Sequence, residues 1–220
     1  MEKMIRKWIV RLLPGRFPGL YSTMDNPMRV PAQEAAYQLA VQRYIQPGEQ
    51  VLDVGFGLGY GLEIMVAAGG RTTGIDIDDK AVNNARRMVK EASGIEEIRT
   101  YDGKIIPYPE KSFDIVTCID VIEHVNDFLG LLKEMVRVSR GVVFISTPNR
   151  RPEFTQRNGR PRNPWHLREW TYDEFQMVLD QVQGVRIDWY FLVGRWEGPF
   201  EVSSTLSSET IALVPVLVRV

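Results

Sequence analysis

An aspartate and four glycines lie at the end of a short apolar segment that begins at residue 50. Residues of these types at such a place could hold a ligand. The chain reads Asp-Val-Gly-Phe-Gly-Leu-Gly-Tyr-Gly from Asp53 to Gly61. Glycines at a strand-to-helix turn let the backbone bend tightly and let a ligand approach it closely. A dinucleotide fingerprint needs glycine at its first, third and sixth positions, but the sixth position counted from Gly55 is Tyr60. Asp53, just ahead of the turn, would also repel a pyrophosphate. These residues therefore argue against a dinucleotide.

Two more acids, Asp76 and Asp102, lie at the ends of the next two apolar segments. Asp76 follows about 20 residues after Asp53, the spacing at which an acid reaches ribose hydroxyls. Asp102 precedes Gly103, where a carboxylate can accept a hydrogen bond from an adenine amino group. Helix capping explains one such acid but explains three together poorly. The pattern favours S-adenosylmethionine, a nucleoside that carries a sulfonium and an ammonium group and no phosphate.

The chain has two histidines, and both are candidates for acid–base chemistry on a second ligand. His124 ends the run Asp-Val-Ile-Glu-His just after the fourth apolar segment, at residues 113–119. His166 follows the fifth apolar segment, at residues 141–146. In a parallel sheet the carboxyl ends of the strands lie at the same edge, where ligands bind. The two side chains could therefore meet over the pocket as a general base or as substrate-positioning groups. The alternative for each is a structural histidine that caps a helix or bonds a backbone carbonyl.

These residues can act together only if a sheet brings the strand ends close to one another. The pattern of apolar residues indicates such a sheet. Short apolar strands alternate with amphipathic helices, which is typical of a doubly wound parallel sheet. The last two strands have no helix between them and are expected to pair antiparallel. The predicted fold class is α/β: a doubly wound, mostly parallel seven-stranded Rossmann-like sheet with an antiparallel C-terminal hairpin. Strands are expected at residues 50–54, 71–75, 97–101, 113–119, 141–146, 185–193 and 210–218, and helices at 31–44, 62–68, 80–92, 128–138 and 172–182.

The 220 residues are expected to form a single domain with four segments. Residues 1–46 are interpreted as an N-terminal helical or lid segment and 47–150 as the cofactor-binding core. Residues 151–170 are interpreted as a substrate loop, and 171–220 as the C-terminal helix and hairpin.

The stretch from residue 150 to residue 168 is strongly basic, with six arginines and one acid. Prolines keep it out of regular structure, and a loop this long inside a compact domain is usually functional. It could receive an anionic acceptor; the alternative is a solvated loop. RNA binding would bring a broader basic face and a pI above about 9, whereas this sequence has a pI of about 6.2. A small anionic molecule is therefore favoured over nucleic acid.

The overall composition excludes several classes of protein. The formal net charge is −1 at pH 7, so no global field favours nucleic acid. One cysteine excludes an internal disulfide and fits a reducing, cytoplasmic compartment. No stretch reaches the ~20 apolar residues of a membrane span. Residues 1–13 predict a short basic amphipathic helix, which could cover the pocket, make a weak peripheral membrane contact or join an oligomer.

From residue 49 to residue 149 the sequence resembles the class I S-adenosylmethionine-dependent methyltransferases. The run from Asp53 to Gly59 is similar to the family's first motif, and Asp76 is similar to its ribose-binding acid. Residues 105–114 and 118–125 resemble the stretches on either side of the fourth strand. The cofactor-binding residues implied are Asp53, Gly55 and Gly57 for the methionine moiety, Asp76 and Ile77 for the ribose and adenine, Asp102 and Gly103 for the adenine edge, and Asp120.

Two groups within this class sharpen the functional hypothesis. Ubiquinone-biosynthesis O-methyltransferases and small-RNA 2′-O-methyltransferases carry an acid-x-x-Glu-His stretch that can ligate a divalent metal. Here the first acid is Asp120, which is shorter than glutamate, so no metal is predicted. The resemblance implies an S-adenosylmethionine-dependent enzyme that methylates an oxygen or nitrogen atom of a small, anionic metabolite, with His124 and His166 as its catalytic candidates. A metal-dependent RNA 2′-O-methyltransferase and a non-catalytic S-adenosylmethionine-binding module are the alternatives, and the oligomeric state is left open.

Overall fold

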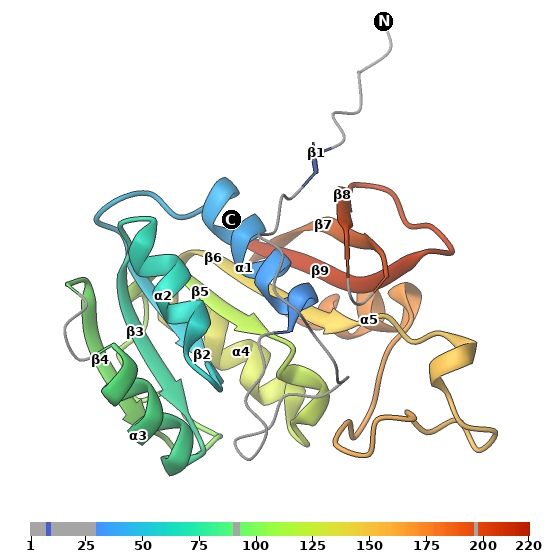
Figure 1. Cartoon of the computed structure of the whole chain (residues 1–220), viewed down its shortest axis with the longest axis horizontal. Coiled ribbons are helices and arrows are strands. Elements are labelled where there is room, and N and C mark those ends of the chain that lie inside the picture. Colours follow the sequence, from blue (N-terminus) through green and yellow to red (C-terminus); the bar gives the residue numbers. More distant parts are fainter. Residues whose placement is uncertain (1–7, 10–29, 90–92, 196–197) are drawn as a thin grey trace, which may run out of the picture.

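The computed structural model describes residues 8–9, 30–89, 93–195 and 198–220, which form one sheet with helices on both faces (Figure 1). The strands are β1 (Trp8–Ile9), β2 (Gln50–Val54), β3 (Arg71–Asp76), β4 (Ile95–Thr100), β5 (Phe113–Ile119), β6 (Ser139–Pro148), β7 (Val185–Gly194), β8 (Phe200–Ser203) and β9 (Thr210–Arg219). The helices are α1 (Pro31–Arg43), α2 (Tyr60–Ala67), α3 (Asp79–Met88), α4 (Phe128–Val138) and α5 (Tyr172–Leu179), with short 3-10 turns η1 (Ile122–His124) and η2 (Pro152–Phe154).

The strand order creates a crevice at the centre of the sheet. Among the described residues the order is β1-β8-β7-β9-β6-β5-β2-β3-β4. Strands β2 to β6 pair in parallel, so their carboxyl ends open at the same edge. The first of them, β2, lies between β3 and β5, where the chain changes its winding direction. Ligands of open α/β sheets bind at such a switch point.

Each face of the sheet is covered by its own set of helices (Figure 1). Helices α1, α2 and α3 pack on one face, where Met65 of α2 belongs to the same buried cluster as Val51. Helices α4 and α5 pack on the other face, where Leu132 of α4 is buried in one cluster with Leu52. Neighbouring residues of β2 thus point to opposite faces, as the strand period of two requires. Burial on both faces explains why β2 and β5 are almost continuously apolar.

The predicted fold class is confirmed, and the seven predicted strands are all present. The last two predicted strands, β7 and β9, pair antiparallel as expected. Their connection contains β8, which was not predicted and which pairs antiparallel with β7. Its four residues alternate between buried and half-buried, and a period-two pattern this short carries little signal. None of the helices in the described ranges could span a bilayer.

The helix predicted over residues 1–13 is wrong at the two positions of that range that the structure describes. Trp8 and Ile9 form β1, which pairs antiparallel with Val202 and Glu201 of β8. An edge strand offers unpaired backbone groups to a neighbouring segment, and pairing there outweighs the helical spacing of the apolar side chains. The other residues of the range lie outside the described residues.

Candidate active site

A cavity of about 410 Å³ lies at the carboxyl ends of the central strands. The glycine turn after β2 lines one part of it, including Gly55 and Gly57. The end of β5, the turn η1 and the loop after β6 line the rest, including Asp120, His124 and His166. One cavity therefore joins the glycine turn to both histidines.

The glycine turn has a backbone that only glycine adopts easily. Gly55 has a φ of +76°, and a Cβ there would lie 2.7 Å from Cγ2 of Val121, closer than real contacts allow. Gly57 has a φ of +54°, and its N–H donates to Oδ2 of Asp76 at 2.9 Å. The turn ends at Gly59, the left-handed residue ahead of α2. The conformation places Tyr60, the first residue of α2, in the wall of the cavity.

Asp53 lies beneath the glycine turn and is fully buried. Its carboxylate accepts hydrogen bonds from Tyr37 Oη at 2.9 Å and from Thr117 Oγ1 at 2.8 Å. Burial raises the pKa of Asp53 to about 7, against the opposing effect of these two bonds. Its side chain is not among those that line the cavity, but that of Tyr37 is. Asp53 therefore ties the end of β2 to α1 and to β5.

The other two strand-end acids, Asp76 and Asp102, differ in burial. Asp76 is buried, and its carboxylate accepts N–H groups of Gly57 and Asp78, which ties the end of β3 to the glycine turn. Burial raises the pKa of Asp76. Asp102 is exposed, and hydrogen bonds from two backbone N–H groups hold the pKa of its carboxyl below the ordinary value. Neither side chain lines the cavity.

Ile77 is an exposed apolar side chain close to Gly103, the residue after Asp102. Ile77 is 67% exposed. A Cβ built on Gly103 would lie 3.0 Å from Cγ2 of Ile77, so these two predicted adenine contacts are close neighbours. An exposed isoleucine beside a glycine offers a flat apolar face that a planar ring could cover.

Asp120 lies between the glycine turn and the histidines. It has a φ of +51°, which is uncommon outside glycine. Its backbone N–H donates to the carbonyl of Ser146 at 3.0 Å, and its carboxylate accepts a hydrogen bond from the Ser146 hydroxyl. Burial raises its pKa. Asp120 thus brings a half-buried acid to the wall of the cavity.

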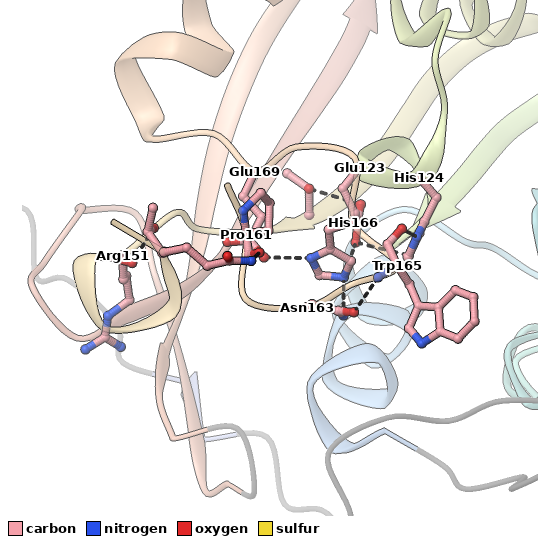
Figure 2. A network of polar contacts seen from close by, with 11 residues as sticks. Glu123, His124, Arg151, Pro161, Asn163, Trp165, His166 and Glu169 are labelled. Atoms are coloured by element: carbon pink, nitrogen blue, oxygen red, sulfur yellow. Dashed lines mark hydrogen bonds and ion pairs between the residues drawn. The ribbon is translucent and has the colours of Figure 1, made fainter. Parts of the chain in front are cut away.

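The structure brings the two histidines together (Figure 2). Their ring centroids lie 4.9 Å apart in an edge-to-face arrangement. Nδ1 of His124 lies 2.8 Å from the carbonyl oxygen of Trp165, and Nδ1 of His166 lies 2.6 Å from Oε1 of Glu169. Desolvation, together with the neighbouring imidazole, lowers the pKa of His124.

Glu123 is a site residue that the sequence reasoning did not single out. It is fully buried, and its Oε2 accepts a hydrogen bond from Thr147 Oγ1 at 3.1 Å. Its Oε1 has no hydrogen-bond partner among the described residues and lies 4.0 Å from Nε2 of both histidines. Burial, and next the charge of Asp120, raise its pKa well above the ordinary value. The signal in the sequence was its place directly before His124.

These side chains fit a divalent cation in number and type. One potential ligand atom each from Glu123, His124 and His166 lies within 4.8 Å of the others, and the carboxylate oxygen without a partner is one of them. Asp120, the first acid of the stretch, instead directs its carboxylate to Ser146. A cation would therefore find three ligands here, two of them imidazoles.

Three of the six arginines in the basic loop contact other side chains of the protein. Arg150 pairs with Glu174 at 2.6 Å, Arg151 pairs with Glu153, and Arg168 lies over the ring of Phe128 at 4.5 Å from its centroid. Arg162 lines the cavity. The structure gives it no ion pair with any described residue, so its guanidinium can meet a ligand.

Several proteins of similar sequence are named as methyltransferases. Residues 52–145 match the family described as "Methyltransferase domain". A "Probable S-adenosylmethionine-dependent methyltransferase" of Mycolicibacterium smegmatis is 34% identical over 149 residues, which cover 67% of this chain and 55% of the relative. A ubiquinone biosynthesis O-methyltransferase of Bordetella bronchiseptica is 34% identical over 137 residues, which cover 58% of this chain and 52% of the relative. The chain thus spans about half the length of the curated relatives it matches.

Solved structures share the fold at low sequence identity. YcgJ of Bacillus subtilis has a TM-score of 0.67 and 16% identity, covering 84% of this chain and 98% of its own. Magnesium protoporphyrin IX methyltransferase of Synechocystis PCC 6803, solved with bound S-adenosylhomocysteine, has a TM-score of 0.65 and 18% identity, covering 86% and 82%. The cyclase SpnF matches as well, with a TM-score of 0.67 and 18% identity over 86% and 80%. The fold alone therefore does not fix the reaction.

The sheet order, the glycine turn and the crevice at the switch point define a class I methyltransferase fold. With the matching family and relatives, they identify residues 52–145 as a methyltransferase domain, similar to that of S-adenosylmethionine-dependent methyltransferases.

Proposed function

We propose that this protein binds S-adenosylmethionine at the glycine turn and transfers the methyl group to an oxygen or nitrogen atom of a small, anionic acceptor. The proposal is carried by the single cavity that has Gly55 and Gly57 on one side and His124 and His166 on the other. A donor and an acceptor that share one cavity can be aligned for an in-line displacement, and alignment alone supplies a large part of such a rate.

Two acids near the glycine turn favour a cationic cofactor. Asp53 and Asp120 form no ion pair with a described lysine or arginine, and burial raises the pKa of each. A ligand that brings positive charge removes part of the cost of ionising them. When bound, the cofactor supplies an electrophilic methyl group on a sulfonium. The residues proposed to hold it are Asp53, Gly55, Gly57, Asp76, Ile77, Asp102, Gly103 and Asp120.

His124 is the better placed of the two histidines to take a proton from the acceptor. The carbonyl of Trp165 can only accept a hydrogen bond, so Nδ1 of His124 carries the ring proton and Nε2 presents a lone pair. The lowered pKa keeps this imidazole neutral and ready to accept. An acceptor O–H or N–H would give its proton to Nε2. The freed electron pair would bond the methyl carbon, and the electrons of the broken carbon–sulfur bond would stay on sulfur.

Arg162 supports an anionic acceptor. Its side chain lines the cavity from the basic loop, and a guanidinium binds carboxylate or phosphate groups through paired hydrogen bonds. Trp165 is 65% exposed and lines the same part of the cavity. Together they could hold an acceptor that has one acidic group and an apolar body.

A metal-assisted transfer is the second candidate, and the unpartnered Oε1 of Glu123 is the observation that favours it. A cation held by Glu123, His124 and His166 would lower the pKa of an acceptor hydroxyl. The two mechanisms differ in one simple respect. Treatment with EDTA abolishes metal-assisted transfer and leaves transfer that uses His124 as a base unchanged.

The test is the transfer of a radiolabelled methyl group from S-adenosylmethionine to a small-molecule extract, with and without EDTA. The proposal predicts label in acidic compounds of low molecular mass, and EDTA-insensitive transfer if His124 acts as the base. Binding of the cofactor without transfer to any fraction would favour a non-catalytic module. Label in oligonucleotides, restored by Mg²⁺ or Mn²⁺, would favour RNA methylation.

The remaining expectations belong to the same proposal. We infer a cytoplasmic location, a small-molecule partner, and a division of labour between a core at residues 47–150 and a substrate loop at residues 151–170. The position of Arg162 and His166 in the wall of the cavity supports the assignment of that loop.

A further inference from the structure

Tyr37 of α1 occupies a notch that a glycine of α2 leaves open at the cavity. Helices α1 and α2 lie side by side on one face of the sheet (Figure 1). A Cβ built on Gly61 would overlap the hydroxyl-bearing carbon of the Tyr37 ring, so a side chain at position 61 would displace that ring. Gly61 has no positive φ, and glycine disfavours a helix relative to alanine. The space that Tyr37 needs therefore explains why position 61 is a glycine.

The hydroxyl of Tyr37 has one hydrogen bond, in which it is the donor. It donates to Oδ2 of Asp53 at 2.9 Å. Burial, and next the charge of Asp53, raise the pKa of Tyr37 well above its ordinary value, so the phenol keeps its proton. A phenol oxygen can also accept a hydrogen bond, and no described residue donates one to it. Donation to a carboxylate polarises the phenol and makes its oxygen a stronger acceptor.

The neighbouring ring of Tyr60 differs because its hydroxyl both donates and accepts. The two rings meet edge to face with centroids 6.0 Å apart, and both residues line the cavity. The hydroxyl of Tyr60 donates to Oε1 of Gln33 and accepts the backbone N–H of Val30. Of these two phenols, Tyr37 is therefore the one whose oxygen is left to accept a hydrogen bond from a ligand.

The surroundings of Tyr37 select a ligand group that is positively charged and can donate a hydrogen bond. Asp53 accepts from its hydroxyl, and Asp120 lines the same cavity. S-adenosylmethionine has two positive groups, but its sulfonium has no hydrogen to donate. Its ammonium group has three N–H donors, and a charge-assisted bond from one of them suits a polarised oxygen. The carboxylate of the same moiety would be repelled by the two acids.

We infer that Tyr37 is a cofactor-binding residue: its oxygen accepts a hydrogen bond from the ammonium group of S-adenosylmethionine while its hydroxyl donates to Asp53. Asp53, which does not itself line the cavity, thus acts on the cofactor through Tyr37. The inference rests on the proposed function, because it takes the cofactor to bind at the glycine turn. It adds to the site a residue of α1, a helix outside the matched methyltransferase domain at residues 52–145.

The test compares two ligands that differ at the amino group. S-adenosylhomocysteine carries the ammonium group, and its deaminated analogue has hydrogen in that place. Calorimetry at pH 8, above the pKa of about 7 of Asp53, measures both affinities with this carboxyl ionised. The unmodified protein should bind S-adenosylhomocysteine about 10- to 100-fold more tightly than the analogue, the range expected for a hydrogen bond to a charged group.

Tyr37→Phe removes the hydroxyl and keeps the ring in the notch at Gly61. It should weaken the binding of S-adenosylhomocysteine by about tenfold or more and leave the affinity for the deaminated analogue within about twofold. Tyr44→Phe is the matched control, because Tyr44 lies on the same helix and its hydroxyl donates to that of Tyr190 at 3.1 Å, away from the cavity lining. It should leave both affinities unchanged.

Equal losses of both ligands in Tyr37→Phe would show that the hydroxyl only supports the structure of the site, and would overturn the inference. Equal affinities of the unmodified protein for the two ligands would also overturn it, and this comparison depends on no variant. In either case, binding of S-adenosylhomocysteine would leave the proposed function standing. A protein that binds neither ligand would contradict the proposed function and the inference together.

Discussion

The two ends of the cavity are built in different ways. The glycine-turn end depends on backbone conformation, with Gly55 and Gly57 at positive φ and the buried acids Asp53 and Asp76 hydrogen-bonded around them. The histidine end depends on side chains, with His124 on η1 and His166 on a loop some 40 residues later in contact through Trp165 and Glu123. The first end is fixed by the fold and suits a cofactor common to a whole class. The second is assembled from loop residues that can vary without disturbing the sheet.

The largest expected effect separates the two ends. His124→Ala removes the free Nε2 and should lower the rate of methyl transfer by about 10²- to 10⁴-fold. Its affinity for S-adenosylmethionine, measured by calorimetry, should stay within about twofold. An equal loss of cofactor affinity would show that the two ends are not separate.

A backbone change should act on the other end. Gly55→Ala places a Cβ against Val121 at a positive φ, and strain of about 1–3 kcal/mol should weaken cofactor binding by roughly 10- to 100-fold. Gly48→Ala is the control, because Gly48 also has a positive φ but has no atom within 4 Å of the added Cβ. Calorimetry should find normal cofactor affinity in Gly48→Ala. Normal affinity in Gly55→Ala would contradict the close-approach account.

The buried acid of the glycine-turn end should leave a mark on stability. Asp53 has a pKa of about 7 in the folded protein against an ordinary value of 3.8, so the folded state binds a proton that the unfolded state has released. Its contribution to the free energy of unfolding therefore falls as pH rises from about 4 to 7, by up to about 1.4 kcal/mol per pH unit, and is constant above pH 7. Asp53→Asn should remove this slope in denaturant titrations of the free protein. An unchanged slope would place the proton elsewhere.

The smallest expected effect concerns the rim of the histidine end. Arg162→Ala should raise the KM for an anionic acceptor by about tenfold, since an exposed guanidinium contributes roughly 1–2 kcal/mol to a charge-assisted bond. Arg157→Ala, from the same loop, is the control because Arg157 is exposed and does not line the cavity. Steady-state kinetics at two salt concentrations would distinguish the pair. Equal effects of both variants would mean that the loop acts through its overall charge alone.

The contrast between the two ends also decides what the sequence could predict. The glycine turn, the strand-end acids and the parallel strands leave strong local patterns, and the predicted fold class is confirmed with strand bounds near those observed. The short β8 and the pairing of Trp8 and Ile9 with it depend on contacts far apart in the sequence. Local spacing therefore predicted a helix where the structure has a strand.

The acceptor end shows the same limit at the level of single residues. The sequence pointed to His124 and His166 individually, but their contact depends on how the loop folds back on η1. Glu123 and Glu169 were not singled out, because an acid beside a histidine is common and only its burial and geometry make it notable. The side-chain positions of Asp76 and Asp102 away from the cavity wall were equally beyond sequence reasoning.

A crystal structure with S-adenosylhomocysteine bound tests the central claim most directly. The account predicts the adenine against Ile77 and Gly103, ribose hydroxyls within hydrogen-bond distance of Asp76, and the sulfur in the cavity facing His124. A ligand whose sulfur points away from the histidines, or one bound outside the glycine turn, would contradict the claim that one cavity joins cofactor and acceptor.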